Sequence, residues 1–421
     1  MAIPAIQKAK RIMVIALLAE TLSATYMLSF PSLVGLATVL YTLAGLTIGV
    51  AFLFLPSFEP ITFHPKHINH TQPLFWYKKA FLIVLGILAV KFSVQYMEDA
   101  PMDYHDADML PIMKIMCQRF LCGKGCHVYD IIPEIWNGIQ PVYFPAMWMP
   151  YCIAVFYKFD LRWITMGAIF SAVTIFFMLL RPFTHKILSL IVSMCVFITL
   201  WWLLTSPTPG LIPYTEEGIV IFYYTLLAVA LFTDNFILIG IAISLCALSR
   251  YALAGWLPAM LIYLIYTKQF KGLIKVISTG IICFVFLMLI PFGWPVLHRL
   301  ISLPGEYIDF AKRVWNDSPE IFDKVLGFAK YFGVQHINLQ HKLLISLSLS
   351  IPSLCMIVSL FLNKTKKRIT LNHLPIATLK IGLAVFYSLI DVPYLYLFYT
   401  ALFFSFIMVV MSLREPVSES I

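Results

Sequence analysis

The stretch Leu33–Leu55 reads LVGLATVLYTLAGLTIGVAFLFL and contains no charged residue. A helix rises about 1.5 Å per residue and satisfies its own backbone hydrogen bonds, so a run of this length crosses about 30 Å of hydrocarbon. Similar apolar runs recur along the chain, at Met13–Phe30, Ala80–Val94, Leu273–Ile290, Leu343–Leu362, Ala377–Ile390 and Tyr394–Met411. The sequence therefore predicts an all-α polytopic membrane protein.

The composition excludes a water-soluble globular fold. Of 421 residues, 61% are hydrophobic and only 12% are charged, and the mean hydropathy is +0.87. Soluble domains carry about 25% charged residues. No internal repeat or low-complexity tract interrupts the alternation of apolar runs and short polar loops.

The placement of charge predicts how the helices are oriented. The formal net charge is +9, and cations cluster at Lys8–Arg11, Lys78–Lys79, Lys268–Lys275 and Lys364–Arg368. By the positive-inside rule these clusters are cytoplasmic, and their charge attracts anionic lipid rather than nucleic acid. No small-residue cleavage site follows the first apolar run, so we expect a retained helix and not a signal peptide.

The count of helices conflicts with this orientation. We count about thirteen apolar segments and expect a bundle of about 12–13 transmembrane helices, whereas two cytoplasmic termini require an even number of crossings. Arg181, His185 and Lys186 interrupt the region Trp163–Leu204. One of its two runs is therefore expected to be re-entrant or half-spanning.

Two long loops are predicted on the outer side. The later one, 292–342, has Ile321, Val325, Phe328 and Phe332 at helical spacing with charged residues between them. This pattern predicts an amphipathic helix that lies in the membrane interface.

The earlier loop holds the candidate chemistry. Asp103, Asp106 and Asp108 lie within six residues of one another. If they were buried together, repulsion and desolvation would raise at least one pKa, and such a carboxylate can act as a general base. Equally, three acids can simply keep an exposed loop in water.

The order of residues in this loop resembles a known superfamily. Asp108 is followed by an apolar-periodic stretch to Gly123, then by Tyr129, and then by the Pro-rich aromatic segment Gln140–Pro150, which contains Tyr143. This order resembles the GT-C membrane glycosyltransferases, most of all the bacterial polyprenyl-phosphate-mannose-dependent mannosyltransferases. The resemblance covers roughly residues 95–163, and elsewhere only hydropathy and loop placement are similar.

The resemblance implies a GT-C-like bundle and a function. It implies that Asp108 is the general base, with Asp106 as the second candidate. A mannose-like hexose or a pentose would pass from a polyprenyl-phosphate donor to a hydroxyl of a glycan, glycolipid or protein, at the outer face of the cytoplasmic membrane. The chain would comprise an N-terminal hairpin with a cytoplasmic loop (1–79), a catalytic module (80–290) with the first outer loop (95–144), an outer amphipathic loop (291–342) and C-terminal helices (343–421).

The residues support a lipid-linked donor because the chain has no glycine-rich phosphate loop for a nucleotide sugar. The leaving phosphate needs positive charge, and the candidates are Arg250, with Tyr251 beside it, and Arg313. Each arginine could instead bind lipid headgroups at the surface.

Other polar groups leave alternatives open. Glu216 and Glu217 could join Asp103 and Tyr143 in binding substrate or a divalent cation, or the two glutamates could simply favour a helix N-terminus. No other cofactor is expected. Glu20, within the first apolar run, should face other helices. In the first outer loop, Cys122 and Cys126 could form a disulfide or remain free thiols.

Two other functions compete with glycosyl transfer. An O-antigen polymerase or ligase would carry its essential groups in the late loop, where only scattered arginines occur. A transporter or flippase of lipid-linked glycans would have internal repeats and polar groups at mid-membrane. The early position of the acids favours the glycosyltransferase.

Overall fold

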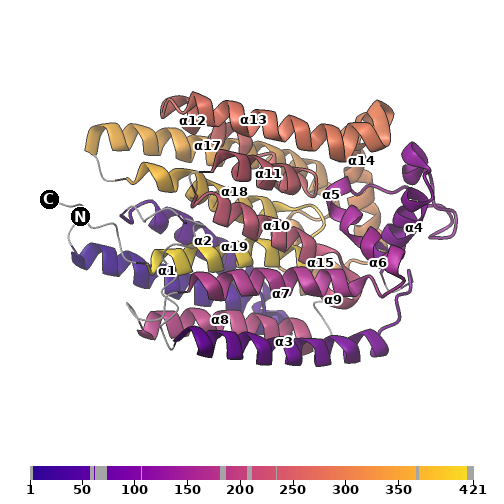
Figure 1. Cartoon of the computed structure of the whole chain (residues 1–421), viewed down its shortest axis with the longest axis horizontal. Coiled ribbons are helices and arrows are strands. Elements are labelled where there is room, and N and C mark those ends of the chain that lie inside the picture. The colour runs from indigo at the N-terminus through magenta and orange to yellow at the C-terminus, as the bar shows by residue number, and fades with distance from the viewer. Residues whose placement is uncertain are drawn as a thin grey trace.

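The computed structural model describes residues 3–56, 61, 74–105, 107–180, 186–205, 211–233, 235–366 and 369–414. These residues form helices and connecting turns, and they contain no strand beyond an isolated bridge between Ile132 and Ile139. Long helices lie side by side along one axis, and short helices gather at one end (Figure 1). The predicted all-α class is confirmed.

Eight of the described helical stretches are long and apolar enough to cross a membrane. They contain α1 (Ile3–Ser23), α2 (Val34–Phe52), α3 (Leu74–Asp99), α7 (Arg162–Leu179), α8 (Lys186–Thr205), α13 (Phe270–Phe284) with the first part of α14 (Ile290–Asp317), α17 (Ile337–Lys366) and α19 (Phe398–Ser412). Outward-facing side chains on the peripheral helices are apolar, among them Ile87 on α3 and Phe286 between α13 and α14, each 64% exposed. Such bare apolar faces are stable only against hydrocarbon.

Shorter helices complete the bundle. Three are apolar, α10 (Glu217–Ala230), α11 (Phe236–Ala247) and α12 (Leu257–Tyr266), and the fourth is α18 (Leu374–Leu389), which contains Lys380. With the eight longer stretches they make twelve passes along the bundle. An even number agrees with the termini, because Lys10 Nζ donates to the carbonyl of Arg414 at 3.1 Å.

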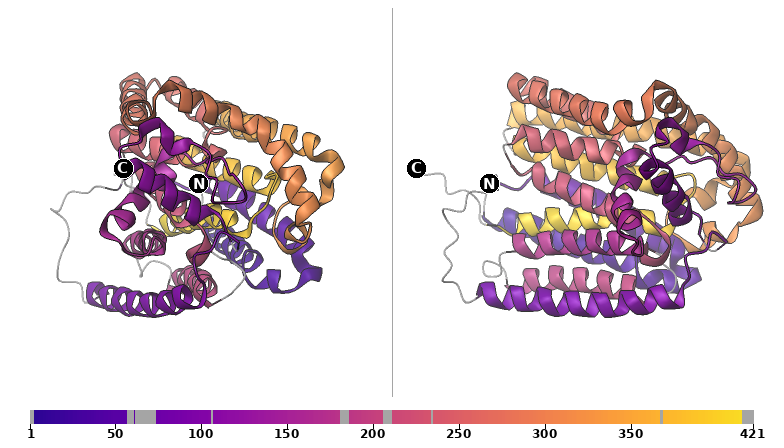
Figure 2. Two further views of the ribbon diagram at one scale, coloured as in Figure 1. Left: turned by 90° about the vertical axis from the view of Figure 1, so that its right-hand side faces the viewer. Right: turned by 45° about the vertical axis from the view of Figure 1, so that its right-hand side comes forward.

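The expectation of a half-spanning run within Trp163–Leu204 is wrong. There α7 and α8 are both complete helices, and Arg181 and His185 fall outside the described residues. The segment that does not cross is the next one upstream, which forms only α5 (Pro145–Trp148) and α6 (Cys152–Tyr157) beside α4 (Met109–Leu121) (Figure 2). Pro150 and a left-handed Lys158 (φ 57°) break this segment into turns.

The predicted interface helix in the late loop is also wrong. The segment forms two short helices, α15 (Glu320–Lys324) and α16 (Ala329–Phe332), because Val325 is extended and Gly327 has φ 110°. Between them the chain enters the bundle: Leu326 is buried, and the N–H of Phe328 donates to the carbonyl of Ser388 at 2.8 Å. The apolar residues at helical spacing are only half-buried, and Val325 packs against the core of the bundle.

The centre of the bundle is α19, which is completely buried and contacts α1, α2, α7, α8, α10 and α18. Small residues let these helices approach closely. A Cβ at Gly218 on α10 would come 2.5 Å from the carbonyl oxygen of Thr165 on α7. Glycine at this position therefore fixes the start of α10 against α7, next to Glu216 and Glu217.

Candidate functional site

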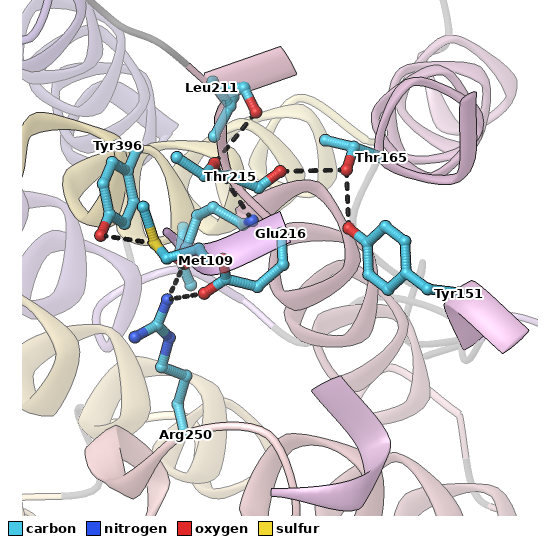
Figure 3. Close-up of polar contacts among 10 residues, drawn as sticks. Met109, Tyr151, Thr165, Leu211, Thr215, Glu216, Arg250 and Tyr396 are labelled. Atoms are coloured by element: carbon cyan, nitrogen blue, oxygen red, sulfur yellow. Dashed lines mark hydrogen bonds and ion pairs between the residues drawn. The ribbon is translucent and has the colours of Figure 1, made fainter. Parts of the chain in front are cut away.

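A buried ion-pair cluster lies at the end of the bundle that holds the short helices. Arg250 Nη2 donates to Glu216 Oε1 at 2.9 Å and to Glu217 Oε2 at 2.6 Å. Both glutamate side chains are 0% exposed, whereas that of Arg250 is 22% exposed. Figure 3 shows the carboxylate of Glu216 turned toward the guanidinium of Arg250.

The local sequence explains this placement. Arg250 follows α11 in an extended conformation, and Glu216 and Glu217 begin α10, where the helix dipole favours negative charge. Thr165 on α7 donates to the carbonyl of Thr215 at 3.0 Å, which fixes the residue before the two acids (Figure 3). The ion pairs thus join the segment after α11 to the start of α10, which α7 holds in place.

The acidic groups of the cluster outnumber its basic group. Two carboxyl groups face one guanidinium, and burial raises the pKa of Glu216, with Arg250 acting against this shift. Glu216 Oε2 and Arg250 Nε are buried and have no hydrogen-bond partner among the described residues. Unpaired buried groups of this kind are costly and are commonly satisfied by a ligand, an ion or an ordered water.

Asp108 lies close to this cluster. It precedes α4, it makes no capping hydrogen bond, and burial raises the pKa of its carboxyl. The next residue, Met109, accepts a hydrogen bond from Tyr396 at 3.2 Å, and Figure 3 shows this pair beside Arg250. Burial and then the charges of Glu216 and Asp108 raise the pKa of Tyr143, which therefore lies near both acids.

The other predicted residues do not join the cluster. Asp103 is exposed and accepts from the backbone N–H of His105, which lowers the pKa of its carboxyl. Tyr251 donates to the carbonyl of Leu300, and Arg313 is exposed on α14. Asp106, the second candidate base, lies outside the described residues.

Neither a cation-binding group nor a disulfide, two of the alternatives that the sequence left open, is found in the described part of the chain. Among the described residues, no three His, Cys, Asp or Glu side chains form a group that could hold a metal ion. Asp103 is separated from the two glutamates, which bind Arg250 instead. Cys122 and Cys126 are free thiols and both are exposed.

Several functional candidates were missed in the sequence. Thr400 on α19 donates to Glu217 Oε1, and His341 on α17 pairs with Asp391 at 2.6 Å. Glu20 has a partner after all, because Lys380 Nζ contacts its carboxylate at 2.5 Å. In the sequence, Lys380 is an isolated charge within an apolar run, and this pattern could have marked it as a residue with a buried partner. The sequence alone does not show which helices are neighbours.

Comparison with known proteins does not assign this chain to a family. Comparison finds no matching family model, no similar curated protein and no similar solved structure.

Proposed function

We propose that this chain is an integral membrane glycosyltransferase that uses a polyprenyl-phosphate sugar as donor and a hydroxyl group as acceptor. The observation that carries the proposal is the proximity of a half-buried carboxyl, Asp108, to the buried cluster of Arg250 with Glu216 and Glu217. A base and a phosphate-binding cation are the two groups that this reaction needs.

The reaction is a single inverting displacement. The acceptor oxygen attacks the anomeric carbon, the bond from that carbon to the phosphate oxygen breaks, and the electron pair leaves with the phosphate. Asp108 accepts the acceptor's proton, for which a carboxyl with a raised pKa is suited. Arg250 stabilises the charge that grows on the leaving phosphate.

Protonation of Glu216 prepares Arg250 for this role. With both glutamates ionised the cluster carries net negative charge and repels phosphate. Burial favours the neutral form of Glu216. In that form, the carboxyl can donate a hydrogen bond to a phosphate oxygen while Glu217 keeps Arg250 in place.

An apolar groove supports a lipid-linked donor. Between α3 and α7 lies an open cavity of about 490 Å³ lined almost entirely by apolar residues, including Gly86 and Phe170. A second, much smaller cavity of about 10 Å³ also has Phe170 in its lining, together with Met166 and Ile212. Met166 adjoins Thr165, which holds the segment before Glu216.

The direct test is transfer from a polyprenyl-phosphate sugar by the full chain in detergent or nanodiscs. The proposal predicts transfer that requires Asp108 and Arg250. If variants of both residues kept normal transfer while Arg313→Ala abolished it, a polymerase-like or ligase-like enzyme would replace this proposal. The site would act at the outer face of the cytoplasmic membrane.

One observation favours a transporter or flippase of lipid-linked glycans as the second candidate. Lys380 and Glu20 form a charged pair inside the bundle, and charges within membrane helices often mark ion or substrate pathways. Movement of a fluorescent lipid-linked glycan across proteoliposomes, without any transfer product, would favour this candidate.

A further inference from the structure

A second polar group lies at the turn between α18 and α19. His341 Nδ1 donates to Asp391 Oδ2 at 2.6 Å, and their side chains are 12% and 1% exposed. The neighbouring Gln340 donates Nε2 to the carbonyls of Leu389 at 3.1 Å and Ile390 at 2.9 Å. Two successive residues of α17 therefore fix the turn between α18 and α19.

This group has unused acceptors. Asp391 Oδ1 and Gln340 Oε1 are buried and accept no hydrogen bond within the described part of the chain. His341, whose side chain is 12% exposed, makes no hydrogen bond through Nε2 with a described residue, and a neutral ring that carries its proton on Nδ1 offers Nε2 as an acceptor. Since buried acceptors rarely stay unpaired, the missing partner is a group that donates several hydrogen bonds.

Two tyrosines connect this group to the proposed transferase site. Burial and then Tyr394 and Asp391 raise the pKa of Tyr307, and Arg250 acts in the opposite direction. Burial and then the charge of Asp108 raise the pKa of Tyr394 to about 12. The ring of Tyr394 stacks on Tyr396 with centroids 5.5 Å apart. Tyr307 and Tyr394 thus lie within electrostatic reach of both polar groups.

We infer that Gln340, His341 and Asp391 form the acceptor subsite, and that it binds the hydroxyl groups of a sugar ring. This inference rests on the proposed function, because it assigns the second substrate to a place beside Asp108. Sugar hydroxyls supply several donors in one rigid ring, which matches three unused acceptors. A phosphate fits poorly, because it has no such donors and Asp391 repels it.

The test measures glycoside binding by the full chain in nanodiscs. Octyl α-mannoside and octyl β-glucoside are titrated below micelle-forming concentrations, and octyl tetraethylene glycol ether serves as a tail without sugar hydroxyls. We expect the glycosides to bind more tightly than the ether. Asp391→Asn and Gln340→Met should each weaken glycoside binding about tenfold, the usual effect of one lost buried hydrogen bond. Asp309→Asn, an exposed acid, should leave binding unchanged.

Two results would overturn the inference. In one, the glycosides bind no better than the ether, and the missing donor is then a buried water. In the other, both variants bind glycosides as the parent does. Gln340→Met preserves side-chain length, and its thermal unfolding midpoint shows whether it folds. Donor binding, measured with a polyprenyl-phosphate sugar, should be retained in both variants, whereas failure of the proposed function would appear as normal transfer by Arg250→Ala.

Discussion

Lys380 on α18 and Glu20 on α1 form an ion pair with 2.5 Å between Nζ and Oε1, and neither side chain has any exposed surface. Lys380 Nζ also donates to the carbonyl of Ala401 on α19 at 3.0 Å. The neighbouring residue, Thr400, bonds Glu217 in the candidate site. The pair therefore ties together three helices of the bundle, one of which reaches the site.

Lys380→Met should destabilise the protein by about 3–5 kcal/mol, because it leaves Glu20 charged and unpaired in an apolar interior. Thermal unfolding in detergent micelles measures this loss. The double variant Lys380→Met with Glu20→Met should recover most of the stability, since an apolar pair of similar volume needs no desolvation. A double variant as unstable as the single one would contradict this account.

Asp108→Asn should lower transfer by about 100-fold to 10,000-fold while donor binding is kept, because the change removes the base and preserves shape. The readout is product formation from a polyprenyl-phosphate sugar. Asp103→Asn, which alters an exposed acid of the same loop, is the matched control and should keep near-normal activity. Equal losses in both variants would point to loop charge instead of catalysis.

Asp108→Asn should also change the thermal stability of the protein. The folded-state pKa of Asp108 is raised above its ordinary value of 3.8, so the folded state holds this proton more tightly than the unfolded chain does. The resulting stability is present at low pH and is lost as pH rises through the folded-state pKa. At pH 7, Asp108→Asn should therefore unfold at a slightly higher temperature than the parent, and this difference should vanish near pH 3.

Donor binding should weaken as pH rises through the folded-state pKa of Glu216, because deprotonation adds negative charge beside Arg250. Glu216→Gln imitates the protonated form and should bind donor with a weaker pH dependence, because Glu217 remains beside Arg250. Arg250→Ala should weaken both binding and turnover, since the phosphate contact exists in ground and transition states. Titration of a polyprenyl-phosphate sugar across pH 5–9 tests all three, and a parent curve identical to that of Glu216→Gln would exclude the protonation role.

Thiol labelling tests the orientation. Cys122 and Cys126 are exposed in the first loop, whereas Cys117, Cys195 and Cys246 are buried. A membrane-impermeant maleimide applied to intact cells should label the first two, and Cys122→Ser with Cys126→Ser should abolish labelling. A cysteine introduced at Lys271, in the first turn of α13, should react only after the cells are opened. Labelling at position 271 in intact cells would reverse the orientation that we predict.

The sequence of the first loop was not enough to assign the catalytic residues, because their surroundings come from distant parts of the chain. The acids Asp103 and Asp108 are alike in sequence, yet one is exposed and bonded to His105 while the other is partly buried beside Glu216. Arg250 stood out in the sequence as a cation at a helix end. Its two carboxylate partners come from 33 and 34 residues earlier, and periodicity cannot reveal that proximity.

By itself, the sequence determined the all-helical membrane architecture, because an uncharged run such as Leu33–Leu55 can satisfy its backbone only as a helix in hydrocarbon. It did not determine which apolar run fails to cross: α7 and α8 are complete, and the prolines upstream divide residues 145–157 into short turns. The tertiary structure alone joined Lys380 to Glu20, Arg250 to Glu216 and His341 to Asp391. Hydropathy depends on each residue's own transfer between water and lipid, whereas a buried charge is stabilised by a partner that only helix packing brings within 3 Å.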